Sequence, residues 1–106
     1  MTLTPALHHI LLALLPGERH GYAVMKDVEA ITGGSLRLGP GTLYGALKRL
    51  LEAGLVEEAG EREAEGDERR RYYRITGKGR SVLAAETARL QRLVAFANDH
   101  LRGALP

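Results

Sequence analysis

Apolar residues recur at helical spacing in four stretches of the chain, separated by segments rich in glycine, proline or charge. The first stretch follows Thr4 and Pro5, which favour the start of a helix, and it ends at Pro16. Its apolar positions are Leu7, Ile10, Leu11 and Leu14. Leu12 and Leu15 lie outside that stripe, so the apolar arc is wider than one packing face needs and predicts a second partner surface.

Two further helices are predicted on either side of a short extended segment. The second helix lies between His20 and Gly33, and its apolar positions are Tyr22, Met25, Val28 and Ile31. Ser35 to Leu38 alternates polar and apolar residues, which predicts a short strand. A Gly-Pro-Gly turn then starts the third helix, which we expect to run from about Pro40 to Ala53.

A hairpin and a long helix complete the predicted set. Leu55 to Ala59 and Arg71 to Thr76 are predicted strands, joined by a glutamate-rich segment that contains Gly66. From Thr76, a suitable N-cap, no proline interrupts the chain until after Leu101. The apolar positions of this helix are Leu83, Leu90, Leu93, Val94, Ala97 and Leu101. A heptad spacing within that set predicts a helix with a partner along its length.

The third helix has two faces of different chemistry. One face gathers the apolar residues Leu43, Ala46, Leu47, Leu50 and Leu51. The other gathers Tyr44, Gly45, Lys48, Arg49 and Glu52. Glycine inside a helix costs about 1 kcal/mol relative to alanine, so Gly45 suggests that another molecule approaches the backbone closely there.

The order of these elements predicts the architecture. Helix, helix, strand, basic helix and hairpin is the order of a winged helix-turn-helix, whose third helix enters the major groove of DNA while the hairpin follows the backbone. The predicted fold class is mainly α, an α+β winged helix. We expect residues 1–76 to form this DNA-binding domain, and residues 77–106 to form a C-terminal dimerisation helix packed on it.

Composition excludes several classes of function. The chain of 106 residues carries a net charge of +2, so any surface for nucleic acid must come from local clustering. It has no cysteine, the adjacent His8 and His9 diverge on a helix, and no nucleophile or paired-carboxylate motif occurs. We therefore expect neither an enzyme, nor a metal site, nor a cofactor. The longest apolar stretch is too short to cross a membrane, and we predict a cytoplasmic protein.

Three motifs in order give the chain a family resemblance. The stretches HGYAVMKDV, GPGTLYGALKRLLEAGLV and RRRYYRITGKGR resemble the successive motifs of PadR-like transcriptional regulators and span about His20 to Arg80. The chain length and the single helix after the wing resemble the short branch of that family. The resemblance implies a homodimeric repressor that releases its operator when a small molecule binds or the dimer rearranges. Gly45 departs from the family pattern, which commonly has proline after the Leu-Tyr pair.

Two sets of site residues follow. The expected DNA-binding residues are His20, Tyr22, Thr42, Tyr44, Gly45, Lys48, Arg49, Arg69, Arg70 and Arg71. The expected dimer interface comprises Leu12, Leu15, Leu83, Leu90, Leu93, Val94, Phe96, Ala97 and Leu101. The expected partners are an inverted-repeat DNA operator, a second copy of the chain and an effector of unknown identity. Without tryptophan and with Phe96 alone in the C-terminal helix, we expect no tight binding of planar aromatic compounds.

Alternatives remain open at this point. The third helix could contact another protein, with its basic residues serving only solubility, whereas RNA binding lacks an aromatic stacking platform. Arg69 to Arg71 could contact phosphates or be neutralised by the acidic residues that precede them. Tyr72 and Tyr73 point to opposite faces of a strand, and either one could fill the core.

Overall fold

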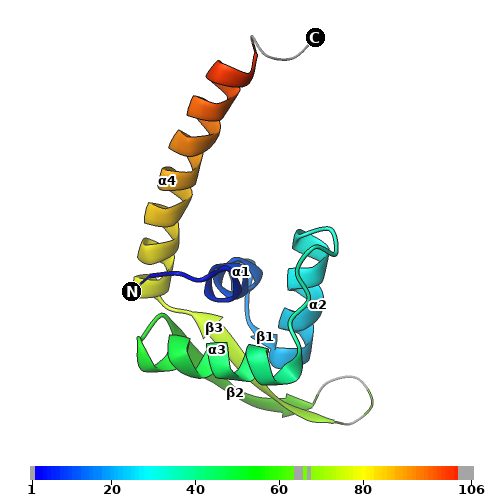
Figure 1. Ribbon diagram of the computed structural model, residues 1–106. Helices are drawn as coiled ribbons and strands as arrows, with labels where there is room; N and C mark the ends of the chain where they lie inside the picture. The colour runs from blue at the N-terminus through cyan, green and yellow to red at the C-terminus, as the bar shows by residue number, and fades with distance from the viewer. Residues whose placement is uncertain (1, 64–65, 67, 103–106) are drawn as a thin grey trace.

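The computed structural model describes residues 2–63, 66 and 68–102, which form a head of three helices and a small sheet followed by one long helix (Figure 1). In chain order the elements are α1 (Pro5–Leu14), β1 (Arg19–His20), α2 (Gly21–Ile31), α3 (Pro40–Glu52), β2 (Val56–Glu63), β3 (Arg69–Ile75) and α4 (Gly77–Leu101). The predicted order of helices and hairpin is therefore confirmed.

The sheet differs from the prediction in one strand. Its order is β1-β3-β2 and both pairings are antiparallel, with His20 opposite Tyr72. The strand expected at Ser35 to Leu38 is wrong, because that segment has no strand pairing and is folded by the Thr32 side chain. The Thr32 hydroxyl accepts a hydrogen bond from the backbone N–H of Leu36 at 3.1 Å. Burial of Leu38 explains the alternation that suggested a strand.

Side chains from α1, α2, α3, the sheet and the start of α4 form one core. The fully buried side chains are Leu7, Ile10, Leu11, Leu14, Val24, Val28, Leu43, Leu47, Leu50, Leu55 and Val56. Tyr73 and Ile75 close the core from β3, so Tyr73 is the tyrosine that faces inward. Threonine side chains cap the starts of α1 and α4, since Thr4 accepts from the N–H of Leu7 at 3.2 Å and Thr76 from that of Gly79 at 3.0 Å.

The hairpin strands extend further toward the tip than predicted. Glu61, Arg62 and Glu63 pair with Arg71, Arg70 and Arg69, beyond a bulge between Glu58 and Glu61. The sequence pattern missed this extension because its residues are charged on both faces and carry no apolar alternation. Glu65 and Asp67, two of the acidic residues that precede the arginines in the sequence, lie outside the described residues.

Helix α4 belongs to the head only at its beginning. Gly79 and Leu83 are buried there, and α4 then rises away from the other elements (Figure 1). The placement of Leu83 at a dimer interface is wrong, because its side chain is 2% exposed in the core of its own chain. Packing of the C-terminal helix on its own head is thus limited to its first turns. Residues 103–106 of the predicted helical domain lie outside the described residues.

Candidate nucleic-acid interface

The outer face of α3 is exposed and carries uncompensated positive charge. Thr42, Tyr44, Gly45, Lys48 and Arg49 are all exposed, while Leu43, Ala46, Leu47 and Leu50 fix the opposite face in the core. Within the described residues, Lys48 and Arg49 have no acidic partner within ion-pairing distance. A Cβ at Gly45 would meet no atom within 4 Å, so the chain's own packing gives no reason for glycine there.

Tyr44 is held across the start of α2. A Cβ added to Gly21 would lie 2.5 Å from the Tyr44 hydroxyl oxygen and 2.8 Å from ring atom Cζ, so the ring rests on the glycine backbone. The side chain is nevertheless 49% exposed. The ring is therefore positioned by α2 while one side of it stays available to a partner molecule. The sequence pattern did not reveal this contact, because the two residues lie on different helices.

His20 caps α2 through its imidazole ring. Nδ1 accepts a hydrogen bond from the backbone N–H of Ala23 at 3.1 Å, which requires an unprotonated Nδ1. The ring also meets Tyr72 edge to face, with 5.4 Å between centroids. Partial burial, followed by the charges of Arg70 and Arg19, lowers the pKa of His20 below 6.5, against the opposing effect of Asp27. The neutral ring thus joins α2 to the sheet.

Two tyrosine rings each contact an arginine of the wing, by which we mean the β2–β3 hairpin. The Arg70 guanidinium carbon lies 5.3 Å from the centroid of the Tyr22 ring, and Lys26 Nζ lies 5.0 Å from the same centroid. The Arg62 guanidinium carbon lies 4.0 Å from the centroid of Tyr72. Of these cation–π contacts, that of Arg70 with Tyr22 joins the wing to the first turn of α2, whereas Arg62 and Tyr72 both belong to the wing. The contact between Arg70 and Tyr22 brings together two of the predicted DNA-binding residues.

The three arginines at the start of β3 each face a glutamate. Arg71 lies between two carboxylates, 3.5 Å from Glu58 and 3.6 Å from Glu61. Arg70 pairs with Glu68 at 2.6 Å. Arg69 reaches Glu61 more loosely, at 4.0 Å. The wing arginines therefore differ from Lys48 and Arg49, because their charge is compensated within the chain.

A second ion-pair network ties the wing to the segment before β1, and sequence analysis missed it. Glu18 pairs with Arg62 at 2.6 Å and with Arg74 at 3.0 Å, and Arg74 also pairs with Glu57 at 2.7 Å. Hydrogen bonds from Arg62 and then Arg74 lower the pKa of Glu18. These partners lie 44 and 56 residues away from Glu18 in the chain, so no local spacing pointed to them.

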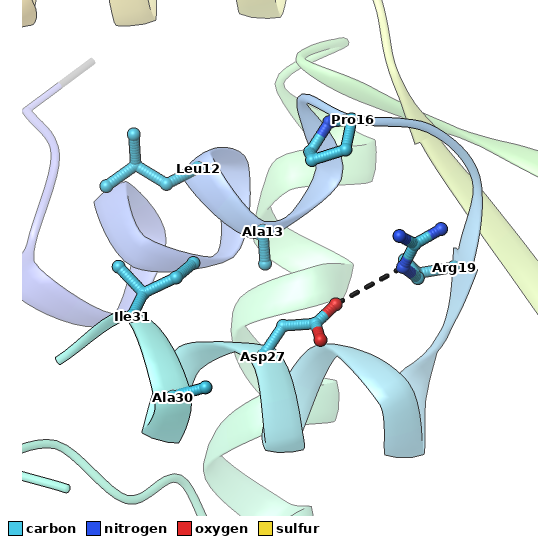
Figure 2. A pocket seen from close by; sticks show the side chains of 7 residues that line it. All are labelled: Leu12, Ala13, Pro16, Arg19, Asp27, Ala30 and Ile31. Carbon is cyan, nitrogen blue, oxygen red and sulfur yellow. Dashed lines mark hydrogen bonds and ion pairs between the residues drawn. The ribbon is translucent and has the colours of Figure 1, made fainter. Parts of the chain in front are cut away.

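An open groove lies between α1 and α2, on a different part of the head (Figure 2). Its lining residues are Leu12, Ala13, Pro16, Arg19, Asp27, Ala30 and Ile31. Arg19 Nε donates to Asp27 Oδ2 at 3.3 Å at one end, while Leu12 and Ile31 line the other (Figure 2). Leu12 and Leu15, the two leucines outside the main apolar stripe of α1, are both partly buried and pack against the core, and Leu12 also lines the groove.

The projecting part of α4 exposes large apolar side chains. Leu93, Val94, Phe96 and Leu101 are each between 52% and 66% exposed, although side chains of this type are usually covered. Phe96 stacks on His100, with 4.1 Å between ring centroids. Leu90 is partly buried and Ala97 is exposed. No described helix is both long enough and apolar enough to span a membrane.

Comparison with known proteins identifies the family. The profile of the "Transcriptional regulator PadR-like family" matches residues 10–85. The chain belongs to the PadR-like family. It is also 42% identical over 84 residues to the "Uncharacterized 37.1 kDa protein in transposon TN4556" of Streptomyces fradiae. That match covers 79% of this chain but only 22% of the relative, so the chain spans about a fifth of that protein's length.

Solved PadR-like structures share the fold. A PadR family transcription regulator from Clostridium difficile R20291 has a TM-score of 0.77 at 24% identity, covering 92% of this chain and 99% of that chain. Bacillus subtilis PadR, solved in complex with operator DNA, has a TM-score of 0.66 at 21% identity, covering 76% of this chain and 45% of that chain. The mainly α winged-helix fold is therefore confirmed, and the matching family is one of transcriptional regulators rather than enzymes.

Proposed function

We propose that this PadR-like regulator is a homodimeric repressor that binds duplex DNA with α3 in the major groove. The observation that supports the proposal best is the outer face of α3, where Tyr44, Lys48 and Arg49 are exposed beside a hairpin that carries further arginines. The operator complex of Bacillus subtilis PadR adds support by analogy of fold. A role in transcription fits the cytoplasmic location that we predict from the sequence.

Base recognition is assigned to α3 and backbone contact to the wing. Lysine and arginine side chains donate to guanine in the major groove, so Lys48 and Arg49 suit base edges. Thr42, in the first turn, suits a base or a phosphate, and the open space at Gly45 lets the backbone of α3 approach the groove closely. His20 and Tyr22 lie at the start of α2, where backbone N–H groups favour a phosphate.

Dimerisation is assigned to α4. Its exposed apolar residues Leu93, Val94, Phe96 and Leu101 need a partner, and the partly exposed Leu12 in the α1–α2 groove offers a matching apolar surface on a second copy. A two-fold axis between the copies sets the recognition helices about 34 Å apart. The operator is then an inverted repeat whose half-sites are separated by roughly one helical turn. An effector that bound at this interface would change the angle between the two wings.

The test begins with selection of bound fragments from the source genome by the purified full chain. We expect enrichment of an inverted repeat, and a log-log slope of affinity against salt that corresponds to several neutralised phosphates. Random duplex of equal length is the control, and it should bind more weakly with a similarly steep slope. Absence of both enrichment and salt dependence would contradict DNA binding and favour a protein-interaction module instead.

A further inference from the structure

The wing has an unusual charge for a hairpin expected beside a polyanion. Residues 56–75 contain seven acidic residues and five arginines, a net charge of −2, whereas the whole chain carries +2. The rest of the chain therefore has a positive net charge, whereas the hairpin that is expected to contact phosphates has a negative one. Two of these acidic residues, Glu58 and Glu61, lie on β2 directly beside the arginines of β3.

The register of the hairpin explains which charges meet. Glu58 is opposite Tyr73 and Glu61 is opposite Arg71, so the bulge between the two glutamates leaves both on the face of the sheet that carries Arg71. The Arg71 guanidinium consequently reaches both carboxylates, through Nη1 to Glu58 and through Nη2 to Glu61. This two-pronged arrangement resembles the way in which arginine binds two oxygens of a phosphate.

We propose that Glu58 and Glu61 are internal competitors of DNA phosphate for Arg71, and that they keep sequence-independent binding to DNA weak. The inference rests on the proposed function. Both carboxylates and the guanidinium are about half exposed, so water screens the ion pairs and phosphate can displace them. When Arg71 turns to a phosphate, Glu58 loses its partner, Glu61 keeps only the loose contact with Arg69 at 4.0 Å, and both carboxylates repel the DNA backbone. Net binding by the wing is therefore much weaker than its three consecutive arginines suggest.

For a regulator, the consequence is that base contacts determine which DNA sites it occupies. Sequence-independent affinity comes from neutralised phosphates, and a genome offers a very large number of such competing sites. Lys48 and Arg49 on α3 have no comparable partner among the described residues, so their charge remains available for the groove. The wing thus contributes little to the affinity for random DNA, and α3 accounts for the difference in affinity between sequences.

The test compares four proteins on random duplex and on the selected operator by fluorescence anisotropy at several salt concentrations. We expect Glu58→Gln/Glu61→Gln to bind random duplex about tenfold more tightly than the unmodified chain, with a slope steeper by about one unit. The control Glu29→Gln/Glu86→Gln has the same net charge, but its lost carboxylates come from the pairs with Arg37 and Arg89. Its affinity for random duplex should stay within about twofold of that of the unmodified chain. Adding Arg71→Ala to the first variant should remove its gain.

The outcomes separate the two proposals. An unchanged affinity of Glu58→Gln/Glu61→Gln, or an equal gain in the control, would overturn the role of the glutamates while leaving DNA binding intact. A gain that survives Arg71→Ala would show that general repulsion acts instead of competition for Arg71, and would also overturn it. Failure of the unmodified chain and of every variant to bind any duplex would overturn the proposed function as well. Thermal unfolding of each variant checks that the fold is retained.

Discussion

At the scale of single residues, the proposed base recognition by α3 should depend most on the side chains of Tyr44 and Lys48. Both are exposed on α3, and Tyr44 is held in place by Gly21. We expect Tyr44→Ala and Lys48→Ala each to weaken operator binding by about 1–3 kcal/mol without unfolding the head. Fluorescence anisotropy measures the change, with Arg92→Ala on exposed α4 as a control of equal charge to Lys48→Ala. Unchanged affinity in both variants would contradict the assignment of α3.

Gly79 is needed for close packing of α4 on the sheet. A Cβ there would lie 2.1 Å from the backbone oxygen of Leu55, which cannot move away as a flexible side chain could. We expect Gly79→Ala to lower the free energy of unfolding by about 3 kcal/mol, within the range for overpacking of a core. Gly77→Ala is the matched control, because a Cβ at Gly77 meets nothing within 4 Å. Urea unfolding measures the stability of both variants. Equal stabilities would show that α4 does not pack on Leu55 as described.

His20 makes stability depend on pH. Its pKa in the folded chain is lowered below the ordinary 6.5, chiefly by burial, so the unfolded chain binds the proton more readily. The stability that His20 contributes is therefore fully present above about pH 6.5 and is lost as pH falls through the lowered folded pKa. We expect the urea midpoint to fall between about pH 8 and pH 5 more in the unmodified chain than in His20→Asn. Asparagine keeps a capping oxygen but cannot titrate, and His8, whose pKa burial also lowers, is common to both proteins.

At the scale of elements, α3 and the wing should differ in what they recognise. Phosphate contacts carry no sequence information, so we expect the triple variant Arg69→Ala/Arg70→Ala/Arg71→Ala to weaken binding to the operator and to random duplex by the same factor, and only modestly, because glutamates already limit what the wing contributes. The slope of affinity against salt should fall by up to about one unit per contact that is lost. Competition binding on both duplexes measures this. A loss confined to operators changed at one base pair would contradict a backbone role for the wing.

At the scale of the whole molecule, the proposed dimer concerns the projecting part of α4. The described chain extends 56 Å along its longest axis against 28 and 22 Å across it, because α4 projects from the head with its apolar residues exposed. We expect light scattering to show a dimer at micromolar concentration. Val94→Glu should give a monomer that binds the operator weakly, since the two half-sites are then bound independently. Ala95→Glu, which adds the same charge about 100° around the helix from both Val94 and Phe96, should remain a dimer.

The sequence by itself determined the helices and their two faces, because helical periodicity, caps and breakers are local properties. Thr4, Thr76 and the Gly-Pro-Gly turn marked helix starts that the structure places at Pro5, Gly77 and Pro40. The three family motifs, which are also local, indicated a PadR-like winged helix. The outer face of α3 followed from its spacing alone, and its role in DNA binding stays a prediction.

Only the tertiary structure decided which distant residues meet. Strand β1 forms at Arg19–His20 because β3 offers it an edge, and two residues have no periodicity from which a strand can be predicted. Leu83, Leu90 and Ala97 occupy the same position in successive heptads, so the heptad spacing does not distinguish them. Leu83 is nevertheless buried, because it lies where α4 still contacts the head. The contacts of Tyr44 with Gly21 and of Arg71 with Glu58 and Glu61 depend on the packing of separate elements, and packing is set by the whole core rather than by local spacing.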